Sequence, residues 1–89
     1  MGLFNRKKSV DLNQVFKDKY KDINKIVSNA NNELDLEIQI SLMELAYDKY
    51  NDLLELIDQG VDYDKNHFLS MQEDLKKKIS LLKGLENED

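Results

Sequence analysis

Eighty-nine residues with a formal net charge of −5 suffice for a single domain, and so short a chain leaves much surface uncovered and gains stability from a partner. The chain has no cysteine, which excludes a disulfide framework and a thiolate metal site and leads us to expect a cytoplasmic protein. It contains no proline and only three glycines, a composition that favours long helices.

Apolar residues recur three or four positions apart in three runs, and this spacing lines one face of an α-helix. The runs predict helices over about residues 12–29, 33–59 and 64–85, with a long middle helix. Because the links are short, we expect an all-α, antiparallel three-helix bundle that forms one domain over residues 12–85. Residues 1–11 are expected to form a flexible basic arm and residues 86–89 an acidic tail.

The start and end of the first helix carry recognisable residues. Ser9 or Asp11 can cap it, and Gln14 stands where a capping box requires it. Asparagines at positions 29, 31 and 32 favour a turn and tolerate left-handed backbone angles. The sequence also allows these asparagines to be an irregularity within one longer helix.

The segment from Glu33 to Leu42 can be interpreted in two ways. Polar and apolar residues alternate along it, which is the period of a β-strand. However, the helical spacing continues through the segment and no second strand is predicted, so we expect a helix. A glycine at the end of this helix, Gly60, and Val61 after it predict a Schellman motif. Asp64 is then expected to cap the third helix, with Tyr63 packing onto Phe68 as a hydrophobic staple.

Charge is unevenly distributed along the chain. The first 29 residues are net basic and residues 30–63 carry nine acids and one lysine, so the middle helix can complement the first within one molecule or across a dimer. The middle helix also has a second apolar stripe beside its main one. We therefore expect a homodimer through the middle helix. The members of the second stripe are Ile38, Leu42, Leu45 and Leu56.

One pattern resembles a calcium-binding EF-hand loop. Oxygen-bearing residues occupy the spacing that such a loop uses, at Asp62, Asp64, Asn66 and Glu73. His67 stands where the loop needs a glycine, and helix capping explains the two aspartates more simply. We therefore predict no metal site and keep a calcium-binding protein as an alternative.

A further alternative uses the arm, where two apolar side chains precede three cations that could contact an anionic membrane or a nucleic acid. These residues are Leu3, Phe4, Arg6, Lys7 and Lys8. The acids of the middle helix could instead imitate a phosphate backbone. Binding to nucleic acid is not favoured, because the chain is acidic and has a single arginine.

We find no catalytic constellation and expect neither an enzyme nor a cofactor. The sequence favours a small regulatory or accessory protein that binds itself and an unidentified protein through an amphipathic helix face. The expected interface residues lie on the main stripe of the middle helix and are Tyr47, Tyr50, Leu54 and Ile57.

Overall fold

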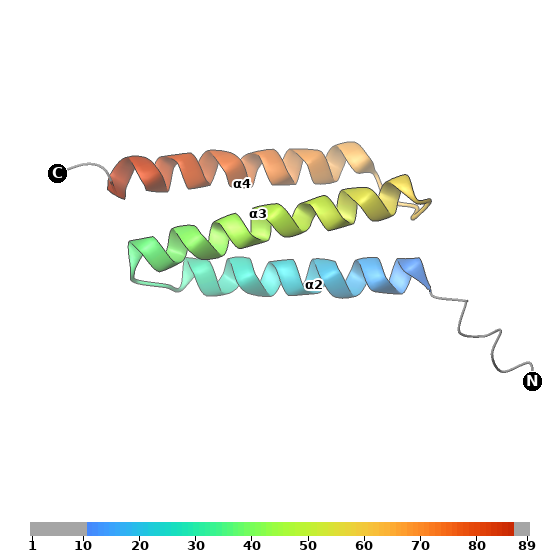
Figure 1. Ribbon diagram of the computed structural model, residues 1–89, viewed down its shortest axis with the longest axis horizontal. Coiled ribbons are helices and arrows are strands. Elements are labelled where there is room, and N and C mark those ends of the chain that lie inside the picture. Colours follow the sequence, from blue (N-terminus) through green and yellow to red (C-terminus); the bar gives the residue numbers. More distant parts are fainter. Residues whose placement is uncertain (1–10, 87–89) are drawn as a thin grey trace, which may run out of the picture.

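The computed structural model describes residues 11–86, which form three helices joined by short links. Helix α2 spans Leu12–Asn31, α3 spans Leu36–Asp58 and α4 spans Lys65–Glu86. Figure 1 shows the three helices side by side with α3 in the middle, and the chain reverses direction at each link. No strand occurs between residues 11 and 86, so the predicted helical bundle is confirmed. Except for Asp11 and Glu86, the expected arm and tail lie outside the described residues.

Helix α2 begins as predicted and ends two residues later than predicted. The Asp11 carboxylate caps it by accepting the backbone N–H groups of Asn13 at 3.1 Å and Gln14 at 3.3 Å. The side chain of Gln14 donates to Asp18 rather than completing a capping box. The helix continues through the asparagines, and the N–H of Asn32 bonds the carbonyl of Ser28. A turn follows at Asn32, and no non-glycine residue among those described has a positive φ, so this turn forms without a left-handed asparagine.

Helix α3 is helical over its whole length, including the part of Glu33–Leu42 that it contains, and it is separate from α2. It begins at Leu36 rather than near Glu33, because Asp35 is its cap and accepts the N–H of Ile38 at 3.2 Å. Glu33 remains in the link, where its carboxylate accepts the N–H of Asp35 at 3.1 Å. The alternation from Glu33 onward therefore does not form a strand, and Leu34 is left in the link.

The predicted Schellman motif ends α3. The N–H of Val61 bonds the carbonyl of Leu56 at 3.1 Å, and the N–H of Gly60 bonds that of Ile57 at 3.0 Å. Gly60 has a φ of 116°, a backbone angle that favours glycine. Val61 and Leu56 are both buried in the core. These bonds satisfy carbonyls that the helix end would otherwise leave unpaired.

The cap and staple of α4 are also confirmed. Asp64 accepts the N–H of Asn66 at 3.0 Å, and the rings of Tyr63 and Phe68 meet edge to face with centroids 6.1 Å apart. The same tyrosine stacks on Phe16 of α2 at 4.3 Å, and Phe16 meets Phe68 at 5.1 Å. This aromatic cluster closes one end of the core and joins the starts of α2 and α4 to the link after α3.

The core lies along the inward faces of the three helices, and its largest fully buried side chains are Phe16, Ile23, Met43 and Leu53. Helix α3 contacts both neighbours, whereas no Cα atom of α2 lies within 8 Å of one in α4. Long side chains bridge that wider separation, as between the hydroxyl of Tyr20 and the sulfur of Met71 at 3.9 Å. With α2 and α4 on either side of it, α3 keeps one face turned to solvent.

Four ion pairs between the described helices show the directions in which these helices run relative to one another. Between α2 and α3 they join Lys19 to Asp52 and Asp22 to Lys49. Residue numbers thus rise along one helix while they fall along the other, so the two helices run in opposite directions. The pairs Lys65–Asp58 and Lys83–Glu44 show the same order between α3 and α4. Lysines of both flanking helices therefore pair with acids of α3, although each pair is exposed and contributes little stability.

Candidate functional site

The expected interface residues lie together on α3, but on its inward face. Tyr50 is 4% exposed and belongs to the buried core. Tyr47, Leu54 and Ile57 are half-buried and pack against that core. The flanking helices therefore cover Tyr50 within one molecule and cover the other three side chains in part. Helical spacing identified an apolar face of α3 correctly, but it carries no information about which neighbour covers that face.

Apolar side chains on the opposite face of α3 remain uncovered. Ile38 is 49% and Leu45 is 44% exposed, and Leu34, just before the helix, is 99% exposed. Ile38, the exposed Ser41 and Leu45 follow a spacing of three and four residues, which places them in one row along α3, and Leu34 precedes this row in the link. We call Leu34, Ile38, Ser41 and Leu45 the outer strip. The second stripe seen in the sequence contained two of these residues and missed Leu34.

The remaining members of that second stripe do not face solvent to the same degree, since Leu42 is half-buried and Leu56 is buried. Beyond the strip the same row continues with exposed acids. The outward face of α3 is therefore apolar in its first half and acidic in its second. The acids of the second half are Asp48, Asp52 and Glu55.

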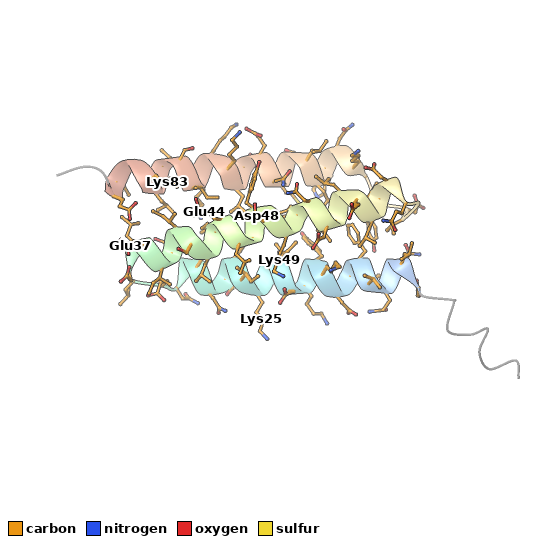
Figure 2. All side chains as sticks on the ribbon, in the orientation of Figure 1. Lys25, Glu37, Glu44, Asp48, Lys49 and Lys83 are labelled. Carbon is orange, nitrogen blue, oxygen red and sulfur yellow. The ribbon has the colours of Figure 1, made fainter. Side chains whose placement is uncertain are left out.

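An open hollow of about 360 Å³ lies beside this row, between α3 and α4. Its apolar part comes from the buried Ile79 and the half-buried Tyr47. Charged groups complete the lining, and these are Glu44, Asp48 and Lys76. Figure 2 shows Glu44 and Asp48 on α3 below α4, with Lys83 close to Glu44. The hollow offers an apolar floor with both signs of charge around it, which suits a side chain of another protein.

The charges around the hollow are partly neutralised within the molecule. Lys83 lies 2.8 Å from the Glu44 carboxylate, and this hydrogen bond and charge, with the charge of Glu86, raise the pKa of Lys83. Glu37, Asp48 and Lys76 form no ion pair with any residue of the described helices and links. These three charges are therefore available to a partner.

A second depression, of about 300 Å³, lies between α2 and α4 on the inward side of α3. Burial, reinforced by the nearby Tyr20, raises the pKa of Tyr50, which lines this depression. The lining mixes amide, apolar, acidic and basic groups without a nucleophile and base at bonding distance, so it suggests no reaction. The other lining residues are Asn24, Val27, Met71, Asp74, Leu75 and Lys78.

The structure does not assemble the calcium loop. Asp62 lies in the link, and Asp64 is used as the cap of α4. Asn66 and Glu73 lie on one helix seven residues apart, which separates them by about 10 Å along its axis. Between residues 11 and 86, no group of three or more histidine and acidic side chains is placed to hold a metal ion. His67 is exposed in the first turn of α4, with its ring 5.2 Å from that of Phe68.

Phosphate mimicry by α3 and contact with a membrane would depend on different parts of the chain. Three acids that could imitate a phosphate backbone, Glu44, Asp52 and Asp58, are paired with lysines, so the acidic face is weaker than the sequence suggests. The arm residues Leu3, Phe4, Arg6, Lys7 and Lys8 lie outside the described residues. Within the part that is described, none of the helices has the length and apolar character needed to cross a bilayer.

Comparison of the chain with protein-family models, with curated proteins and with solved structures found no match.

Proposed function

We propose that this protein is a non-enzymatic interaction protein and that the outer strip of α3 is where another protein docks. The observation that carries the proposal is the exposure of Ile38 and Leu45 in a helix whose other large apolar side chains are half-buried or buried. Single exposed leucines are common on protein surfaces. A row of them at helical spacing is the pattern by which one helix packs against another protein.

The strip can supply enough binding energy for a specific contact. Complete burial of a leucine or isoleucine contributes about 1.5–3 kcal/mol, and Leu34, Ile38 and Leu45 are exposed by between 44% and 99%. Their combined burial is therefore worth several kcal/mol before the entropic cost of association is subtracted. Ser41, in the middle of the strip, is small enough for a partner's backbone to approach α3 closely.

Photo-crosslinking in cells tests the proposal. Benzoylphenylalanine at position 45 is expected to give a discrete protein adduct, and Ile38→Asp in the same chain is expected to remove it. The matched control places the photoreactive residue at Leu69 of α4, which is 41% exposed but not part of the strip. Circular dichroism establishes that each variant is folded. Equal labelling from positions 45 and 69, or an adduct that Ile38→Asp leaves unchanged, would contradict docking at the strip.

The proposal keeps the cytoplasmic location expected from the sequence, since a chain of this size without cysteine suits a reducing compartment. Fractionation of cells that express the full chain is expected to recover it with cytoplasmic markers. Recovery with a membrane or secreted fraction would contradict this part of the proposal.

A further inference from the structure

We infer that the outer strip binds a second copy of this chain, with the two α3 helices antiparallel and crossing at Ser41. The inference rests on the proposed function and names the partner. An antiparallel crossing places each residue before Ser41 opposite the residue equally far after it. Ile38 of one copy, three residues before the crossing, is then level with the partner's Glu44 and lies beside its Leu45, one residue further along. The two serines face each other at the centre, where small side chains allow close packing.

The acidic half of the row favours the antiparallel direction. In a parallel pair, Asp48, Asp52 and Glu55 would each face their own copy, and like charges placed opposite one another destabilise an interface. In the antiparallel pair, Asp52 and Glu55 lie eleven and fourteen residues past Ser41, whereas α3 begins only five residues before it. These two acids then extend beyond the start of the partner's α3 and avoid their own copies.

The antiparallel pair also places a projecting side chain opposite a hollow. Leu34 is 99% exposed and lies in the link two residues before Leu36. The crossing places Leu36, five residues before Ser41, level with the partner's Ala46, so Leu34 lies just past that level. At that level the hollow of about 360 Å³ opens between α3 and α4, with Tyr47 and Ile79 in its lining. The two-fold symmetry repeats this contact, as an isologous interface requires. Leu34 thereby gains an apolar site that its own molecule does not provide.

Charges at the edge of the strip agree with this arrangement. Glu37 stands two helical turns before Glu44, so it projects on the same side of α3, the side on which Glu44 meets Lys83 of α4; Figure 2 shows it near the start of α3. In the antiparallel pair the α4 side of one copy lies over the α4 side of the other. Glu37, four residues before Ser41, then lies level with the partner's Leu45, next to the hollow that Lys76 lines with Glu44 and Asp48. Glu37 and Lys76 both lack an ion pair within the described residues.

Sedimentation equilibrium of the purified full chain at 150 mM NaCl tests the inference. We expect the wild type to dimerise, Ile38→Asp to be monomeric, and Glu37→Lys and Lys76→Glu each to raise the dimer Kd about tenfold, because each change replaces two opposite-charge contacts by like-charge ones. Glu37→Lys combined with Lys76→Glu is expected to recover most of the loss. Lys77→Glu is the matched control, since it makes the same charge change one position away from the hollow's lining.

A wild type that is monomeric at all concentrations would overturn the inference, and so would a dimer that Ile38→Asp leaves intact or a double charge swap that restores nothing. The swap variants alter exposed side chains, and circular dichroism verifies that they fold. Failure here is distinguishable from failure of the proposed function. A monomeric protein that still forms a position-45 adduct with a different protein would reject the second copy and support docking at the strip.

Discussion

Two glycines offer a test in which the same substitution has opposite effects. Gly60 ends α3 with a φ of 116°, and Gly84 lies inside α4 near its end. Apart from the local backbone and the adjacent residues, a methyl group added at either position meets no atom within 4 Å. Clashes with the rest of the molecule are therefore excluded at both sites, and the difference between Gly60→Ala and Gly84→Ala reports the local backbone conformation.

The expected magnitudes follow from that conformation. An alanine held at a left-handed angle costs about 1–2 kcal/mol, while a chain with one glycine fewer gains about 0.4–1 kcal/mol from its less flexible unfolded state. Gly60→Ala should therefore lower the free energy of unfolding by about 1 kcal/mol. Gly84→Ala keeps helical angles and should raise that free energy by about 0.5 kcal/mol, because helix propensity counts for less near a fraying end. In a domain this small, 1 kcal/mol corresponds to about 4–8 °C in Tm.

Urea unfolding followed at 222 nm measures both changes, with all variants at one protein concentration because self-association would add to apparent stability. Gly60→Asn serves as an intermediate control, since asparagine enters left-handed angles more readily than alanine. A Gly60→Ala protein as stable as the wild type would refute the assigned role of Gly60 in the Schellman motif. Equal changes of the same sign at both glycines would show that something other than backbone angle is being measured.

The remaining predictions concern one buried amide and the alkaline pH range. The Gln72 amide donates to the Tyr47 carbonyl at 3.0 Å and to the Asn51 side chain at 2.9 Å. Gln72→Met should therefore cost about 1 kcal/mol in urea unfolding. Gln72→Glu should lower the free energy of unfolding more at pH 7 than at pH 5, because a carboxylate facing two acceptors has a raised pKa and its protonated form is favoured in the folded state. Equal losses at the two pH values would contradict this. Burial raises the pKa of Tyr50 above 10.0, so above pH 10 the unfolded state loses this proton first and stability should fall as pH rises. Tyr50→Phe should reduce the fall without abolishing it, because the raised pKa of Lys83 acts in the same direction; an unchanged alkaline slope would count against this assignment.

Features with local causes could be predicted from the sequence. Asp11 and Asp64 cap their helices because a carboxylate two or three residues before a backbone N–H can reach it without help from distant residues. Gly60 and Val61 end α3 through bonds that span only six residues. The helix over Glu33–Leu42 was misplaced by three residues at its start, because Asp35 competes with upstream residues as the cap and local pattern does not rank them.

The location of the candidate site depends on which neighbour covers each face of α3. Packing between residues far apart in the chain determines this, so local sequence patterns do not predict it. Two apolar stripes on one helix are visible in the sequence, and Tyr47 and Tyr50 favour the fuller one as the interface because tyrosine is enriched at binding hot spots. Folding instead turns the fuller stripe inward, with Tyr50 buried and Tyr47 half-buried, because α2 and α4 gain more by covering it. Ile38 and Leu45 remain exposed because α2 and α4 lie on either side of α3. Between residues 11 and 86 there is no further helix that would cover its outward face.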